Sequence, residues 1–377
     1  MDFLYSEEQA MMRESVARYL CDGHGFDKRA DRLSDPDKLA AQVMAELTEL
    51  GLTALLVPEA HGGLGGSVCD FHGVLREIGA ALYVSPLSTS SILATGAILA
   101  SGVTRIQEAY LPRLAAGSVL LGCALDHSVT SAPTSARLEG GRWRLSGEKH
   151  NILFGSQAVA YVVLAEVESA DADPVPGLFL VDRQEQGGEV SVAETYRLVD
   201  GSPAASVRFS NAMGEALFDL DVPESRARAV DSVIRLGIAV ACAEGLGAAE
   251  GAIAMTAEYV GSRRQFGKTL AENQAVRHRI AEMLVNLESI KSMSMLAAIA
   301  CDQPSSTLAD DHSRAKVLLG VHGRKIVEDA IQLHGGIGMT EECRVGHYLQ
   351  RFQVLDHAFG DSGWHAHRLG SKIGMSE

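Results

Sequence analysis

The stretch YVGSRRQFGKTL, residues 259–270, joins two long helical patterns and carries an unusual group of side chains. Two cations, Arg263 and Arg264, stand beside the amide of Gln265, the ring of Phe266 and a glycine. Arginine offers a planar fork of donors that suits a diphosphate, and a phenylalanine can lie against a flat ring. A helix C-terminus, with arginine interacting with the helix dipole and glycine as the cap, would also account for these residues.

A second segment, QLHGGIGMTEE at residues 332–342, ends another apolar helical pattern in Gly335 and Gly336. A glycine pair lets a ligand lie on the backbone amides, and Gln332 can supply hydrogen bonds. A two-glycine helix stop followed by a turn would have the same sequence. Together, the two segments favour a ligand with a diphosphate over two unrelated helix ends.

The spacing of apolar residues divides the rest of the chain into three parts. Their order, helical then β then helical, predicts an α+β fold. Residues 1–118 carry apolar positions at three-to-four spacing, which predicts a helical domain. Residues 119–222 hold short apolar runs, with Gly140 and Gly141 placed as a hairpin turn, which predicts a β-barrel-like domain. Residues 223–377 return to long helical patterns and predict a C-terminal helical bundle.

Composition narrows the function classes. A formal charge of −15 over 377 residues argues against binding to nucleic acid, because phosphate contacts need clustered Lys and Arg. No apolar run approaches the ~20 residues that span a bilayer, and the acidic N-terminus lacks the pattern of a signal peptide, so we expect a cytoplasmic protein. The 6 cysteines are scattered singly, which favours neither a disulfide framework nor a metal site.

The sequence resembles an acyl-CoA dehydrogenase over nearly its full length. VPEAHGGLGG at residues 57–66 is similar to the family's PExxGG turn, RRQFGK at 263–268 to its Arg-x-x-Phe-Gly segment, and QLHGGIGM at 332–339 to its Gln-x-x-Gly-Gly segment. The resemblance implies a helical domain, a β domain and a four-helix C-terminal bundle. It also implies an FAD-dependent enzyme that desaturates an acyl-CoA between its α and β carbons.

The resemblance implies which residues hold the cofactor. Arg263 and Phe266, with Gln265 between them, would contact FAD held by a neighbouring subunit. Gln332, Gly335 and Gly336 would contact its adenosine and diphosphate end across a dimer interface.

The resemblance also implies the partners. The family is usually a tetramer that passes electrons to an electron-transfer flavoprotein. The ACAEGLG stretch and the chain ending are most similar to small subunits of the pimeloyl-CoA dehydrogenase type and to steroid side-chain dehydrogenases. Several of those form heterotetramers with a larger dehydrogenase subunit.

Desaturation needs a carboxylate that takes the α proton while hydride leaves the β carbon for flavin N5. Most family members place this glutamate in a Tyr-Glu-Gly segment, but the matching residues here are 359–361 and the position falls on Gly360. Two candidates remain. Glu244 lies on an apolar helix where a lone buried acid is costly, and it could be the base or half of a structural ion pair. Asp361 lies beside the vacated position.

The β domain departs from the family as well. ALDHSVTSAP at residues 124–133 replaces the usual Thr-Glu-Pro and Gly-Ser-Asp pattern, and residues 151–153, Asn-Ile-Leu, replace Trp-x-Thr. Either a partner subunit supplies the flavin-ring contacts, or the chain is a catalytically silent partner. GLGAAEG at residues 245–251 mimics a nicotinamide-binding turn, but such a turn follows a strand, so these glycines predict close helix packing instead.

Overall fold

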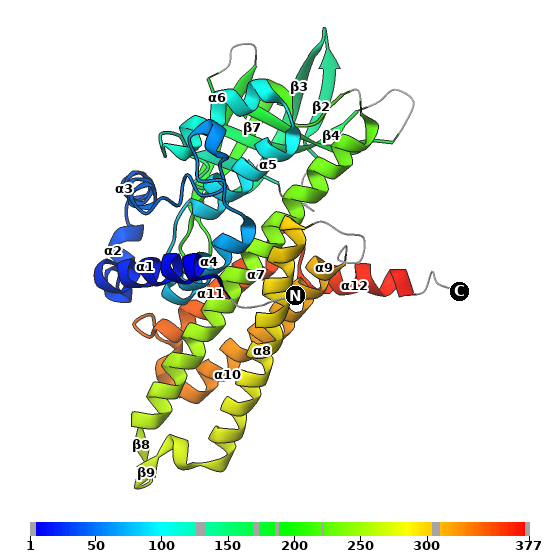
Figure 1. Cartoon of the computed structure of the whole chain (residues 1–377). Coiled ribbons are helices and arrows are strands. Elements are labelled where there is room, and N and C mark those ends of the chain that lie inside the picture. The colour runs from blue at the N-terminus through cyan, green and yellow to red at the C-terminus, as the bar shows by residue number, and fades with distance from the viewer. Residues whose placement is uncertain are drawn as a thin grey trace. The chain divides into compact units, whose positions relative to one another are not determined.

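The computed structural model describes residues 5–125, 133–168, 173–184, 188–220, 222–303 and 310–373. Its architecture is α+β, with N-terminal helices, a central sheet and a C-terminal helical bundle, so the predicted fold class is confirmed (Figure 1). Two compact units are distinguished by packing. The helical unit consists of Met1–Arg29, Val68–Val84 and Ile238–Glu377, and the sheet unit consists of Ala30–Ser67 and Ser85–Gly237.

The sheet unit is built on a seven-stranded sheet whose strand order is β1-β4-β2-β3-β7-β5, with β6 paired to β7. Because β4 also pairs with β5, the strands β4, β2, β3, β7 and β5 form a closed circuit, which agrees with a barrel-like arrangement. Gly140 and Gly141 form the predicted turn between β2 and β3, and both have positive φ. The strands are β1 (Leu121–Ala124), β2 (Ser135–Glu139), β3 (Arg142–Leu153), β4 (Ala160–Val167), β5 (Val175–Asp182), β6 (Glu189–Arg197) and β7 (Pro203–Ala216).

Helices accompany this sheet within the same unit. They are α3 (Pro36–Glu49), a π-helix (Leu87–Ala94), α5 (Thr95–Ser101) and α6 (Thr104–Ala115). Helix α3 begins as its sequence dictates, because Asp35 accepts a hydrogen bond from the backbone N–H of Lys38 at 3.1 Å and proline occupies the first turn.

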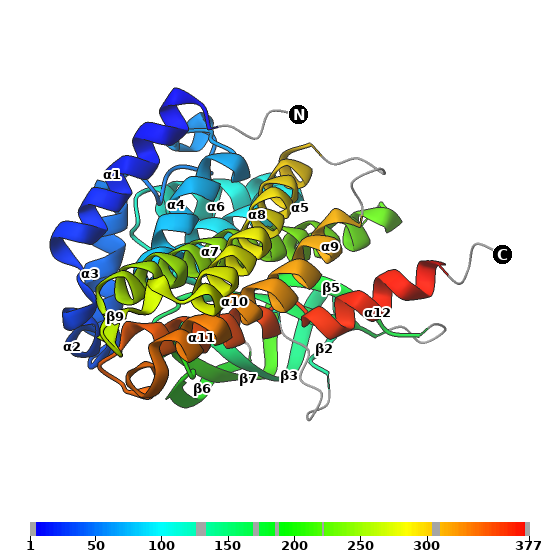
Figure 2. The same ribbon diagram turned by 90° about the horizontal axis from the view of Figure 1, so that it is seen from below.

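The helical unit holds both segments that the sequence singled out. Its elements are α1 (Glu7–Gly23), α4 (Val68–Ala81), the part of α7 (Pro223–Ser262) from Ile238 onward, β8 (Arg264–Gln265), β9 (Lys268–Thr269), α8 (Gln274–Asp302), α9 (Asp311–Leu318), a π-helix (Leu319–Gly323), α10 (Arg324–His334), a 3-10 helix (Gly335–Met339), α11 (Arg344–His357) and α12 (Ser362–Ile373). Figures 1 and 2 show α8 and α10 alongside α7, with the β8–β9 hairpin at the end of α7.

Glycines on α7 sit at helix contacts. A Cβ on Gly247 would lie 1.7 Å from the carbonyl oxygen of Arg76 on α4, and a Cβ on Gly251 would lie 2.3 Å from the hydroxyl of Tyr348 on α11. A Cβ on Gly245 would lie 2.4 Å from a methyl of Leu319. These glycines therefore permit close helix packing, and they lie within a helix rather than at a dinucleotide-binding turn.

Within the described ranges, two helices are long and apolar enough to cross a membrane by length and composition alone. In the segment 224–262, 83% of the apolar window is buried inside the protein, which is typical of a core helix. The corresponding value for the segment 274–302 is 39%. The cytoplasmic location and the domain boundaries at residues 118 and 222 stay predictions.

Candidate functional site

The first segment folds into a hairpin at the end of α7. Gln265 pairs with Lys268 across the two short strands, and the turn between them is made by Phe266 and Gly267, both with positive φ. Such a turn is typical of a two-residue hairpin, but a phenylalanine in this conformation is an uncommon and costly choice. Its side chain is 98% exposed, and Arg263 and Gln265 are exposed too. All three predicted cofactor residues of this segment are thus accessible.

The second segment follows α10. Gly335 has φ 67° and ψ −145°, a combination that is essentially restricted to glycine, and it ends the helix. A Cβ at Gly335 or Gly336 would meet no atom within 4 Å, so their backbone faces open space rather than a packed neighbour. Gln332 is exposed on the last turn of α10. This backbone leaves room for the close approach of a ligand, and the contact with a cofactor stays a prediction.

Glu244 is buried on α7, with 2% of its surface exposed. The guanidinium of Arg351 on α11 donates a hydrogen bond to its Oε2 and forms an ion pair with it. The carboxylate is therefore partnered within the helical unit. Sequence reasoning missed Arg351, and only its place nine residues before Gly360 could have signalled it.

Asp361 lies in the turn between α11 and α12. Its Oδ1 accepts a hydrogen bond from the backbone N–H of Trp364 at 2.7 Å, which makes it the N-terminal cap of α12. The turn itself contains Phe359 at φ 60° and Gly360 at φ 90°. A Cβ on Gly360 would lie 2.9 Å from Cε3 of Trp364, so both the backbone and the space favour glycine where the family commonly has glutamate.

Two buried basic side chains hold this turn in place. Lys316 donates to the carbonyl oxygens of Leu355 and Asp356 at 2.6 and 2.8 Å, and burial lowers its pKa to about 8. His365 contacts the carbonyl oxygen of Phe359 at 3.0 Å through Nε2, and burial lowers its pKa to about 4. A neutral His365 therefore donates from Nε2 at neutral pH.

The sheet unit carries the two departures from the family pattern. Asn151, at the end of β3, has φ 55°, and its backbone N–H donates to the hydroxyl of Tyr196 at 2.7 Å. Ile152 is fully buried. Most of the stretch 124–133 lies outside the described residues, so the substituted Thr-Glu-Pro region has no structural account here.

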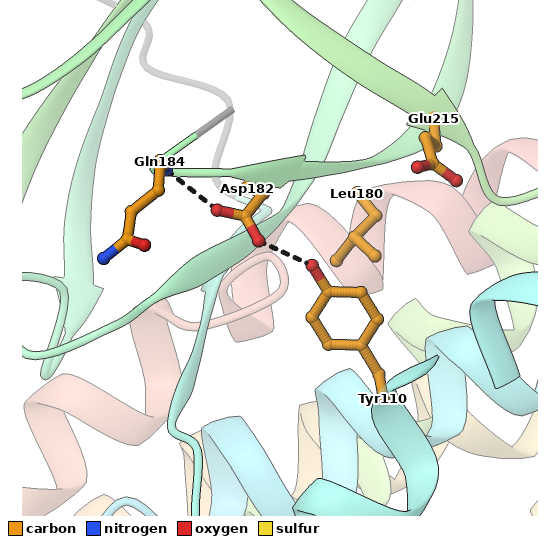
Figure 3. Close-up of a pocket in the computed structure, with 5 residues that line it drawn as sticks. All are labelled: Tyr110, Leu180, Asp182, Gln184 and Glu215. Carbon is orange, nitrogen blue, oxygen red and sulfur yellow. Dashed lines mark hydrogen bonds between the residues drawn. The ribbon is translucent and has the colours of Figure 1, made fainter. Parts of the chain in front are cut away.

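The sheet unit also has a pocket of about 320 Å³ between α6, β5 and β7. Tyr110 donates to Oδ2 of Asp182 at 2.9 Å, and Oδ1 of Asp182 accepts from the backbone of Gln184 at 2.8 Å (Figure 3). Glu215, on another wall, pairs with Arg105. None of the residues that the sequence singled out lines this pocket.

The residues present fit an FAD at the two segments of the helical unit. Exposed arginine, amide and aromatic groups stand on one hairpin, and an open diglycine backbone with an adjacent amide stands on the neighbouring turn. These are the donors and the ring contact that a flavin dinucleotide needs at its diphosphate and aromatic ends.

The comparisons with known proteins assign the chain to the flavin-dependent oxidoreductases that act on CH–CH groups. Residues 6–118 match the family model of the acyl-CoA dehydrogenase N-terminal domain, and residues 230–373 match that of the C-terminal domain. The chain belongs to the acyl-CoA dehydrogenase family.

Relatives and a solved structure agree over almost the whole chain. An acyl-CoA dehydrogenase of Bacillus subtilis (strain 168) is 28% identical over 368 residues, which cover 93% of each chain. Subunit CarC of the caffeyl-CoA reductase-Etf complex of Acetobacterium woodii is 25% identical and covers 91% of this chain and 92% of its own. A variant of the Tcur3481-Tcur3483 steroid ACAD is similar in structure, with a TM-score of 0.87 and 26% identity over 98% of each chain.

Proposed function

We propose that this chain carries out the FAD-dependent α,β-desaturation of an acyl-CoA thioester as one subunit of a tetramer. The observation that carries the proposal is an exposed Phe266 hairpin and an open Gly335–Gly336 turn on the same helical unit. An exposed aromatic ring on a backbone with positive φ is unfavourable alone, so a ligand or a second subunit that covers it accounts for its presence.

In this proposal both segments bind the FAD of the neighbouring subunit. Arg263 and Gln265 bind its diphosphate and polar groups, and Phe266 packs against a ring. Gln332 and the open backbone at Gly335 and Gly336 contact the adenosine and diphosphate end. The exposure of these residues and their open surroundings support the assignment.

Glu244 is the proposed base. Bound FAD would supply the hydride acceptor for the β hydrogen. A carboxylate oxygen of Glu244 takes the α proton, and the electron pair of the broken Cα–H bond becomes the new double bond. Asp361 is the weaker candidate, because its carboxylate already caps α12.

Arg351 constrains this role. Its guanidinium holds Oε2 of Glu244 through a hydrogen bond and an ion pair, so this oxygen already has a partner. For Glu244 to act, substrate binding has to weaken or displace the Arg351 contact.

The same ion pair favours a second candidate function, a catalytically silent subunit that completes a heteromeric dehydrogenase. In that case Glu244 and Arg351 are a structural pair, and a larger subunit supplies the base and the flavin-ring contacts. The Tcur3481-Tcur3483 steroid ACAD is named after two polypeptides, which is consistent with such an assembly. The Etf complex named for CarC makes an electron-transfer flavoprotein the proposed acceptor.

Glu244→Gln separates the two functions. The chain is purified alone and with a co-expressed larger subunit, and reduction of an artificial acceptor by an acyl-CoA is followed together with flavin absorbance. If Glu244 is the base, the substitution lowers kcat by at least ~100-fold without loss of flavin, the size expected for a general base.

Glu250→Gln is the matched control, because Glu250 lies on the same helix and pairs with Arg76 at 2.5 and 2.6 Å. It should leave kcat within a few-fold of the parent. An active complex whose rate is unchanged by Glu244→Gln supports the silent subunit, and a complex without flavin removes both functions.

A further inference from the structure

We infer that Tyr259 and His334 form a clamp inside each subunit that sets the distance between the two FAD-binding segments. The inference rests on the proposed function, since it assigns positioning residues to the same site. Neither residue belongs to the predicted contact set, and 75 positions separate them in the chain.

The two rings stack almost face to face. Their centroids are 4.4 Å apart, and the planes are inclined by 18°. The hydroxyl of Tyr259 also reaches the carbonyl oxygen of His334 at 3.4 Å. Aromatic pairs at this separation are worth more than their buried area alone, and a parallel pair holds the two backbones at a defined spacing.

Each of the two residues that carry these rings also contacts one of the two segments. The carbonyl oxygen of Tyr259 accepts a hydrogen bond from the backbone N–H of Arg263 at 2.8 Å, where α7 gives way to the hairpin. His334 immediately precedes Gly335, and its Cβ lies 3.0 Å from the position that a Cβ on Gly338 would take. A change in the ring spacing therefore moves the arginine hairpin relative to the diglycine turn.

The histidine has a defined tautomer. Its Nδ1 lies 2.8 Å from the carbonyl oxygen of Ala330, which can only accept, so Nδ1 carries the hydrogen. Nε2 is then an acceptor, and it is buried without a partner among the described residues. A buried acceptor left unsatisfied is unfavourable. His334 therefore contributes its ring and its Nδ1 hydrogen bond at this position, and its Nε2 contributes no hydrogen bond among the described residues.

A fixed spacing matters for a ligand that contacts both segments. A dinucleotide that binds two separately moving loops has to order them on binding, whereas preorganised loops avoid this cost. Most residues of the hairpin and the diglycine turn are exposed, so burial of their own side chains contributes little to fixing their positions. The stacked rings of the half-buried Tyr259 and the buried His334 supply this order.

The test measures FAD affinity of the apoprotein by flavin fluorescence, together with the thermal midpoint of the apo form. Tyr259→Leu and His334→Asn remove the stack, and His334→Asn keeps a donor for Ala330. Both should raise the dissociation constant of FAD by roughly three- to tenfold, the amount that an aromatic pair of this kind accounts for. Tyr259→Phe and His334→Phe keep two stacked rings and should stay within about twofold.

His357→Phe is the matched control. Its Nδ1 also contacts the carbonyl oxygen four residues earlier, Gln353, at 2.8 Å, but the side chain is exposed. It should not change FAD affinity. Parent-like affinity in Tyr259→Leu, with FAD bound normally by the parent, overturns the clamp. If Tyr259→Leu does not fold, equal weakening by His334→Phe and His334→Asn overturns it too. A parent that binds no FAD overturns the proposed function instead.

Discussion

Acid should destabilise the helical unit through a buried histidine that accepts a proton less readily in the folded chain than in the unfolded chain. His72 on α4 is 2% exposed, its Nδ1 lies 2.7 Å from the hydroxyl of Tyr5, and its Nε2 lies 3.0 Å from the hydroxyl of Ser294. Burial, with a smaller contribution from the charge of Arg76, lowers its pKa from 6.5 to about 4. The unfolded chain therefore binds a proton at a higher pH than the folded chain does.

The direction and size of the effect on the free energy of unfolding follow from the linkage between protonation and folding. Stability from this group is fully present above pH 6.5 and is lost as the pH falls toward 4, because the unfolded state takes up the proton first. At pH 5 nearly every unfolded chain but only about a tenth of folded chains carry the proton. The free energy of unfolding should then be about 2 kcal/mol lower at pH 5 than at pH 8 from His72 alone.

Urea denaturation followed by circular dichroism at pH 8, 7, 6 and 5 measures this loss. His72→Gln removes the titrating group, so its decrease in stability between pH 8 and 5 should be smaller than that of the parent by about 2 kcal/mol. At a slope near ~3 kcal/mol/M, the difference is about 0.7 M in the urea midpoint. His357→Gln, at an exposed histidine, is the control variant. Parallel pH curves for the parent and His72→Gln would refute the reasoning.

Three further substitutions test the packing around the site. Gly247→Ala places a methyl 1.7 Å from the carbonyl oxygen of Arg76, so we expect a loss of about 1–3 kcal/mol or more, seen as a lower thermal midpoint. Gly360→Glu, which restores the usual glutamate, should cost about 1–3 kcal/mol because of φ 90° and the nearby Trp364, and should not raise kcat. In the parent, the free energy of unfolding should rise by up to about 3 kcal/mol between pH 8 and 10.5, because the folded chain releases the proton of Lys316 before the unfolded chain does. Lys316→Met should abolish this rise. An alkaline pH profile of unfolding free energy that is the same in the variant and the parent would contradict this.

The local signals in the sequence were sufficient for the fold class, and they single out the two segments that we propose bind FAD. Period-3.6 patterns and the Gly140–Gly141 turn depend on residues close together in the chain, so they can be recognised without tertiary contacts. The conformations of Phe266 and Gly335 are likewise local properties of a tight hairpin and a helix end.

The partners of the buried groups depended on the tertiary structure. Glu244 was recognisable as a costly acid on an apolar helix, but its ion pair comes from Arg351, 107 residues away. Asp361 was adjacent to the vacated glutamate position, and only the start of α12 made it a helix cap. Tyr259 and His334 likewise meet because two helices pack together. Such contacts join residues whose separation follows no local period, so the chain alone specifies which groups need a partner, and packing decides which partner each one finds.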